Sequence, residues 1–157
     1  MARLHPSAER VQKALEALGF SVPVRELPQS TRTAPEAARA AGVTVGQIVK
    51  SLIFMAGNQA LLVCASGSNR VSIEKLSALT GQRVRQASAD EVKAATGYSI
   101  GGVPPAGHIT KLRTLIDRDL VQYGEICAAA GTPNAVFLTT PQQLLQMTQG
   151  EVADVKE

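Results

Sequence analysis

The sequence predicts a single α+β domain in which short helices flank a mixed, mostly antiparallel sheet. At 157 residues the chain is long enough to bury a core of its own. Short strand-like apolar runs are mixed with short capped helices, without a regular βαβ repeat or an internal repeat. Two of these runs are joined by a two-residue Gly-Asn turn, which is typical of an antiparallel hairpin. We therefore expect residues 1–157 to form one domain without a linker.

The first quarter of the chain is predicted to form a helix, a strand and a second helix. Apolar residues at helical spacing indicate a helix over residues 6–19, and alternation indicates a strand over residues 20–27. A Pro-Gln-Ser-Thr run then breaks the strand. A capping box that begins at Thr33 opens the second helix over residues 36–41. The apolar residues that set the helical spacing are Val11, Leu15 and Leu18.

The centre of the chain predicts the hairpin. Residues 46–55 form a strand-like run, the turn follows at Gly57 and Asn58, and residues 59–65 form the second arm. Both arms are largely apolar. We therefore expect both faces of the sheet to be covered.

The remaining elements are short. Serine and threonine caps predict three more helices, over residues 73–79, 89–95 and 141–147. Brief apolar runs predict further strands at residues 115–117 and 135–138.

Composition limits the classes of partner. The net charge is +3, from 16 basic and 13 acidic residues, which permits a nucleic-acid partner without requiring one. The three Phe, two Tyr and no Trp argue against a protein that stacks single-stranded bases on aromatic side chains. Cys64 and Cys127 lie in apolar runs, which is typical of buried free thiols in a reducing compartment. With no leader and no membrane-length apolar run, we expect a cytoplasmic protein without a membrane partner.

Lys50 is the first candidate functional residue. It lies inside the apolar run Ile-Val-Lys-Ser-Leu-Ile-Phe, where a charge is unfavourable unless it is paired. One interpretation is a structural lysine that extends its charge into solvent or protects a sheet edge. The other is a cation that points into a pocket and holds a carbonyl, carboxylate or phosphate.

Residues 96–108 form the second candidate, a loop with four glycines, two prolines and a histidine. It matches neither a dinucleotide-binding fingerprint nor a phosphate-binding Walker loop. Glycine lets the backbone approach a ligand, so the N–H groups of this loop suit an oxyanion or a planar polar group. A purely structural turn is the alternative.

His108 and Asp117 are further candidates. A lone histidine is commonly structural, and Asp117 ends an apolar strand, where a turn or an ion pair would also explain it. A Ser-His-Asp triad can be written from Ser99, His108 and Asp117, but nothing in their spacing supports it, because triads are recognised by geometry.

These motifs together resemble the YbaK/ProX family. The resemblance rests on Gly-Gln-Ile-Val-Lys-Ser-Leu at residues 46–52, on Pro-Glu-Ala-Ala at residues 35–38 and on the glycine-proline loop over residues 97–108. It covers nearly the whole chain, and the two principal motifs in this order are more specific than either alone. The family includes free-standing aminoacyl-tRNA deacylases and the editing insertion of bacterial prolyl-tRNA synthetase.

The resemblance implies a compact mixed fold and hydrolysis of the ester that joins a wrongly attached amino acid to tRNA, without a metal or organic cofactor. The family's pocket lysine matches Lys50, its Gly-x-x-x-Pro loop matches residues 101–105, and its aspartate matches Asp117. We therefore predict catalytic roles for Lys50, Gly101 and Gly102. The predicted substrate-binding residues are Ser51, Ser99, Pro105, His108 and Asp117.

The expected substrate is tRNA(Pro) that carries alanine, cysteine or a similarly small amino acid, bound at its acceptor end. Residues 21–34 contain no aromatic side chain and are expected to form a pocket wall. Prolyl-tRNA synthetase is a candidate partner, and the sequence leaves a homodimer open. Two other functions stay open: a non-catalytic module that holds aminoacyl-tRNA beside a synthetase, and an esterase for small activated esters.

Overall fold

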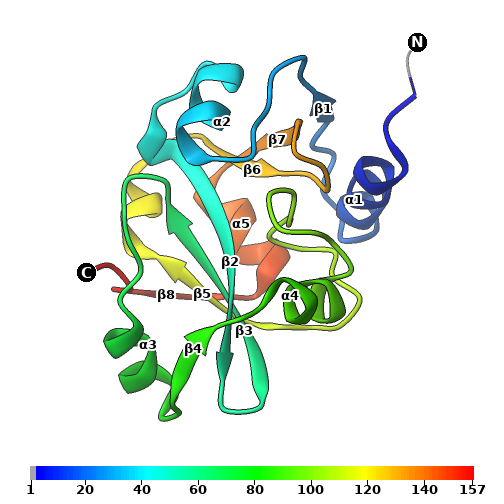
Figure 1. The fold of residues 1–157 in the computed structure, drawn as a ribbon. Coiled ribbons are helices and arrows are strands. Elements are labelled where there is room, and N and C mark those ends of the chain that lie inside the picture. Colours follow the sequence, from blue (N-terminus) through cyan, green and yellow to red (C-terminus); the bar gives the residue numbers. More distant parts are fainter. Residues whose placement is uncertain (1–2) are drawn as a thin grey trace.

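A long antiparallel hairpin, β2 (Ile48–Ala56) and β3 (Gln59–Ser66), runs through the centre of the molecule (Figure 1). The structure is a computed structural model that describes residues 3–157. Ala56 pairs with Gln59 across a two-residue turn in which Gly57 has a φ of +60°, a conformation that glycine adopts without strain. The predicted hairpin is therefore confirmed, except that residues 45–47 form a 3₁₀ turn, η1 (Val45–Gln47), ahead of the first arm.

The hairpin is part of an eight-stranded mixed sheet, as predicted. The other strands are β1 (Val24–Glu26), β4 (Val84–Gln86), β5 (Arg113–Asp117), β6 (Ile126–Ala129), β7 (Ala135–Thr139) and β8 (Glu151–Ala153). They lie in the order β1-β7-β6-β2-β3-β5-β8, and β4 pairs with β2 outside this path. β2 pairs in parallel with β6, β3 with β5, and β5 with β8, while the other pairings are antiparallel.

The outer edge of β2 is shared by two strands that do not meet. β6 pairs with Ile48 and Val49, and β4 pairs with residues 54–56. The Ile53 carbonyl accepts from the Ala87 N–H just after β4, so no strand of the described chain pairs with residues 50–52 on this edge. In an antiparallel ladder, alternate residues turn their N–H and C=O groups toward the partner strand. The Ala56–Gln59 pair that closes the turn is of this kind, so the backbone of Ser51 faces away from β3 and into the gap.

Within residues 3–157, five α-helices surround the sheet: α1 (Pro6–Ala17), α2 (Ala34–Ala41), α3 (Ile73–Thr80), α4 (Ala89–Thr96) and α5 (Pro141–Thr148). The four predicted caps are present, since each side-chain oxygen accepts a hydrogen bond from the backbone N–H three residues later. The capping residues are Thr33, Ser72, Ser88 and Thr140. The first helix ends at Ala17, two residues before the predicted limit.

The strand predicted over residues 20–27 is too long, because only β1 is extended and paired. The Gln12 side chain of α1 donates to the Val22 carbonyl at 2.9 Å and accepts from the Val24 N–H at 2.7 Å. A helix side chain therefore takes the place of a strand partner just before β1. Three strands, β4, β6 and β8, were not predicted, and each has only three or four residues.

The core lies on both faces of the sheet, as the apolar arms of the hairpin predict. Leu62 and Cys64 belong to a cluster with α1, α4 and α5, while their neighbours Leu61 and Val63 pack with Leu76 of α3 on the other face. The prediction that Cys64 and Cys127 are free and buried is confirmed. Burial raises the pKa of the Cys64 thiol to about 12 and that of Cys127 to about 11. No helix within residues 3–157 has the length and hydropathy that crossing a membrane requires.

Candidate active site

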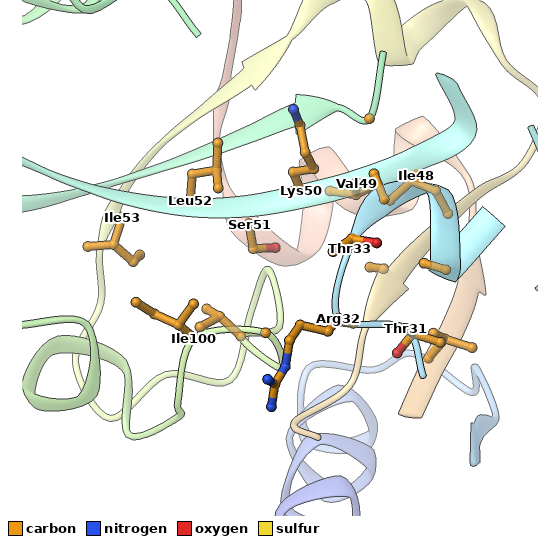
Figure 2. Close-up of a pocket in the computed structure, with 18 of the residues that line it drawn as sticks. Thr31, Arg32, Thr33, Ile48, Val49, Lys50, Ser51, Leu52, Ile53 and Ile100 are labelled. Carbon is orange, nitrogen blue, oxygen red and sulfur yellow. The ribbon is translucent and has the colours of Figure 1, made fainter. Parts of the chain in front are cut away.

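A cavity of about 570 Å³ opens at the gap in the edge of β2 (Figure 2). Its walls come from β2 itself, from the ends of β4 and β6, from residues 31–37 and from the loop after α4. Lys50, Ser51 and Gly101 all line it. Two segments about fifty residues apart in sequence, the lysine strand and the glycine loop, therefore meet in one place.

Successive side chains of β2 leave the strand on opposite sides. Figure 2 shows Ser51 and Ile53 on the side of Arg32 and Ile100, while Lys50 lies on the other side. This alternation is a property of any strand. The Ser51 hydroxyl is buried and has no hydrogen-bond partner among the described residues.

The Lys50 ammonium donates a hydrogen bond to the backbone carbonyl of Asn69. Burial lowers the pKa of Lys50, and the Arg70 charge adds to this effect while Asp117 opposes it. The lysine is therefore half-buried and close to a carboxylate, but it makes no ion pair within 4 Å among the described residues. A cation in this position can still attract a phosphate or carbonyl oxygen at the cavity.

Asp117 lies close enough to Lys50 to affect its pKa, but it is outside the cavity wall. Its side chain is fully enclosed and accepts hydrogen bonds from the backbone N–H of Ser66 at 3.0 Å and of Asp119 at 2.9 Å. It also accepts from the Asn69 side chain at 2.8 Å. Asp117 thus anchors the turn after β3, and that turn supplies the carbonyl that holds Lys50.

The glycine loop meets the cavity through Gly101, whose φ is +97°. Gly102 serves the loop itself: its N–H donates to the Ser99 carbonyl at 3.1 Å, and its carbonyl accepts from the Gly131 N–H at 2.8 Å. A Cβ at Gly102 would lie 2.8 Å from the backbone nitrogen of Thr132, closer than two such atoms can approach. Gly102 is therefore needed for close backbone packing.

Pro105 and His108 line a different cavity, of about 450 Å³, between α1 and α5. The Nε2 atom of His108 lies 2.7 Å from the Pro104 carbonyl. Burial lowers the pKa of His108, and this hydrogen bond opposes the shift. Ser99 is exposed, His108 faces the second cavity and Asp117 is enclosed elsewhere, so these three side chains form no triad.

Residues 31–34 line the cavity but were not singled out individually from the sequence. Thr31 is only 5% exposed, and its hydroxyl has no hydrogen-bond partner among the described residues. Arg32 is exposed, and its aliphatic part lies beside Gly101. The composition of residues 31–34 did not indicate that Thr31 or Arg32 lines a cavity. Their positions depend on contacts with distant segments, such as the hydrogen bond from the Thr31 N–H to the Pro133 carbonyl.

The charged side chains in the described cavity wall are all positive. Arg32 and Lys50 are the charged residues among the described residues that line it, and no carboxylate does. Much of the remaining wall is apolar, with small side chains that include Ala37, Ala128 and Ala129. Such a site suits a small acyl group attached to an anionic carrier.

The family comparison matches residues 28–147 to the aminoacyl-tRNA editing domain. This segment contains the whole cavity wall, from Thr31 to Val136.

Among the chain's relatives, the uncharacterized protein YwhH of Bacillus subtilis (strain 168) is 32% identical over 130 residues, which cover 82% of this chain and 83% of that protein. The "Putative Cys-tRNA(Pro)/Cys-tRNA(Cys) deacylase EbsC" of Enterococcus faecalis (strain ATCC 700802 / V583) is 26% identical, with 78% and 76% covered. A crystal structure of "a putative trans-editing enzyme for prolyl tRNA synthetase" is 53% identical, with 99% of both chains covered and a TM-score of 0.95. On these matches, the chain belongs to the aminoacyl-tRNA editing domain family.

Proposed function

We propose that the protein hydrolyses the ester bond of a mischarged aminoacyl-tRNA, and that its substrate is tRNA(Pro) carrying a small non-cognate amino acid such as alanine or cysteine. The observation that carries this proposal is the cavity at the gap in β2, because Lys50, Ser51 and Gly101 meet there without a carboxylate in the described wall. The names of the Enterococcus faecalis relative and of the similar crystal structure support tRNA(Pro) as the carrier.

Hydrolysis of an aminoacyl ester does not require a strong protein nucleophile. An aminoacyl ester is already activated, so positioning and stabilisation of the developing oxyanion supply most of the acceleration. Water adds to the carbonyl carbon, the bond to the ribose oxygen breaks, and that oxygen leaves with a proton. Free amino acid and intact tRNA are the products.

The residues take distinct parts in this proposal. The backbone at Gly101 receives the substrate carbonyl, while Lys50 attracts the 3′-terminal nucleotide through its phosphate or the ester region. Ser51 contacts the acyl group from the floor of the cavity. Gly102 and Asp117 act through the segments that they hold, namely the glycine loop and the turn that holds Lys50.

Ser99, Pro105 and His108 receive supporting parts in the proposal. The Ser99 carbonyl closes the turn at Gly102, and His108 contacts the Pro104 carbonyl at the far end of the same loop. We therefore assign these residues to the shape of the loop rather than to contact with the ester.

The test is a panel of purified aminoacyl-tRNAs. Alanyl-, cysteinyl- and prolyl-tRNA(Pro) are incubated with the protein, and ester loss is followed with the Lys50→Ala variant as the control. We expect rapid loss of a small non-cognate amino acid and a stable prolyl ester. Binding without hydrolysis of any member would favour a module that delivers aminoacyl-tRNA, and turnover of small esters without tRNA would favour a general esterase.

A further inference from the structure

Lys50 and Asp117 lie on the same face of the sheet, with one small residue between them. Lys50 pairs with Ala65 of β3, and the parallel ladder between β3 and β5, which ends one residue earlier, places Ala65 beside Asp117. Residues opposite one another in neighbouring strands point to the same face. Since strands lie about 4.8 Å apart, the two backbones are roughly 10 Å apart, a distance that a lysine side chain and a carboxylate can span. The register therefore favours a direct ion pair across the alanine.

Asn69 makes contact with both charged groups instead. Its backbone carbonyl accepts a hydrogen bond from the Lys50 ammonium, and its side-chain Nδ2 donates to Asp117 at 2.8 Å. The Asn69 N–H donates to the Ser66 carbonyl at 3.0 Å, which folds the turn back onto the end of β3. Lys50 has no carboxylate within 4 Å among residues 3–157. One residue thus uses its two polar groups to hold a cation and an anion apart.

The carboxylates near this turn are satisfied without the lysine. Asp117 accepts only from N–H groups of uncharged amides, one of them the Asn69 side chain. The same Nδ2 atom donates to Asp119 at 2.8 Å, so both hydrogens of the amide are used. Asp119 also pairs with Lys156 at 3.0 Å. The Lys50 ammonium therefore meets a neutral carbonyl where an acid could have met it.

This arrangement preserves the charge of Lys50 for the cavity that it lines. An ammonium has three N–H donors, and a single hydrogen bond to a carbonyl leaves two of them for a ligand. A direct ion pair would hold the side chain against the acid and cancel much of its attraction for a phosphate. Arg70, the next residue after Asn69, adds a second positive charge near the ammonium. Both features suit an anionic ligand.

We propose that Asn69 is a positioning residue that keeps the Lys50 ammonium from pairing with Asp117, so that the cation stays available to the negatively charged 3′ end of the substrate. This inference rests on the proposed ester hydrolysis, in which Lys50 attracts the terminal nucleotide. Asn69 lies outside the described cavity wall, so it acts through the lysine. Without the Asn69 amide, Asp117 lacks one donor, and we expect the lysine to supply it and to turn away from the cavity.

The first test is a double-mutant cycle between Asn69 and Lys50. Values of kcat/KM are measured for Asn69→Ala, Lys50→Ala and the double variant, with the aminoacyl-tRNA(Pro) that the wild type hydrolyses fastest. We expect Asn69→Ala to lower kcat/KM by about tenfold when the lysine is present, the lower end for a lost hydrogen bond to a charged group. In the Lys50→Ala background the same change should have little effect, because no cation remains to be positioned.

Two further variants keep the cycle interpretable. Asn58→Ala removes an exposed amide at the hairpin turn, at the opposite end of β2 and β3, and should leave kcat/KM unchanged in both backgrounds. Asn69→Ser keeps a shorter donor and should lower kcat/KM less than Asn69→Ala does. Thermal unfolding shows which variants are folded, and the serine variant takes the place of the alanine variant in the cycle if the latter is not.

The second test is a crystal structure of the folded Asn69 variant. We expect the Lys50 Nζ atom to lie within 4 Å of the Asp117 carboxylate, the usual limit for an ion pair. A purely structural asparagine would not produce this contact. A variant structure in which Lys50 keeps its distance from Asp117 would overturn the inference.

The kinetic outcomes distinguish this inference from the function beneath it. Equal losses in the presence and absence of Lys50 would show that Asn69 serves only the fold, and the deacylase proposal would stand. Wild-type kcat/KM in Asn69→Ala would also overturn the inference alone. Failure of the wild type to hydrolyse any aminoacyl-tRNA(Pro) counts against the deacylase proposal itself, and the crystal structure would then still report whether Asn69 separates the two charges.

Discussion

Adjacent residues on β2 meet different surroundings. Lys50 reaches a backbone carbonyl on one side of the strand, whereas the Ser51 hydroxyl on the other side has no hydrogen-bond partner in residues 3–157. The sequence marked Lys50 because a charge in an apolar run is unusual. Nothing in the sequence marked the gap in strand pairing beside Ser51, since serine is common in strands and turns alike. The gap arises only because β4 and β6 end where they do.

Replacing Lys50 tests its proposed role at the level of one side chain. Lys50→Ala is expected to lower kcat/KM for deacylation by about 100-fold, the scale of losing one positioned electrostatic group. The fold should survive, because burial already disfavours the charged lysine. Lys13→Ala, whose side chain is 73% exposed, is the control. Wild-type rates in the Lys50 variant would exclude the role.

His108 is expected to make stability depend on pH. Burial lowers its pKa in the folded protein, so the unfolded chain binds a proton first as the pH falls. The free energy of unfolding should therefore decrease as the pH drops through the unfolded-state value of about 6.5. Urea unfolding at a series of pH values between about 8 and about 5 measures this loss. The free energy of unfolding should depend less steeply on pH in His108→Gln. An unchanged slope in the variant would contradict the assignment.

At the scale of elements, the glycine loop and the β6–β7 turn form one packed unit. Gly102 and Gly131 are joined by a backbone hydrogen bond, and a Cβ at Gly102 has no space beside Thr132. The unusual run of glycines and prolines was visible in the sequence, but the segment against which it packs was not. Contacts between residues about thirty positions apart leave no local pattern.

Gly102→Ala is therefore expected to destabilise the protein by about 1–3 kcal/mol, the usual cost of overpacking. Activity should fall as well, because the displaced loop carries Gly101 at the cavity. Gly124→Ala is the matched control, since a Cβ there has open space and no strained φ. Thermal or urea unfolding of the two variants makes the comparison. Equal stability of both would show that the loop can shift freely.

The unpaired edge of β2 has a measurable consequence for backbone exchange. The N–H groups of Lys50 and Leu52 face β3, whereas that of Ser51 faces the gap. Hydrogen exchange should therefore be faster at Ser51 than at its two neighbours. A bound substrate analogue should slow the exchange at Ser51 selectively. Equal protection of all three amides in the free protein would contradict an open edge.

At the scale of the whole molecule, a sheet covered on both faces supports a cavity at the interrupted edge of β2. The mild positive charge of the chain and the exposed Arg32 beside the cavity suit a polyanionic carrier such as tRNA. Neither feature identifies the carrier alone. The family match supplies the class to which that carrier belongs.

Added salt should lower the affinity for tRNA, because the protein is proposed to contact phosphates of the tRNA. If two phosphates are neutralised on binding, affinity should fall by about tenfold for a fourfold rise in salt. Arg32→Ala should make the dependence of log affinity on log salt shallower by about one. Measurements of kcat/KM across a salt series check both expectations. A slope that is the same in the variant and the wild type would exclude a phosphate contact by Arg32.

The sequence alone determined the hairpin, the helix caps and the two motifs that meet at the cavity, because these depend on residues close together in the chain. Tertiary structure decided which polar groups remain free. It joined Gly102 to the β6–β7 turn, bonded the enclosed Asp117 to the Asn69 side chain and placed His108 at a separate cavity. It also left Ser51 between the ends of two strands that were not predicted. The physical reason is that hydrogen-bond satisfaction is a property of the whole packed chain, whereas periodicity and capping are local.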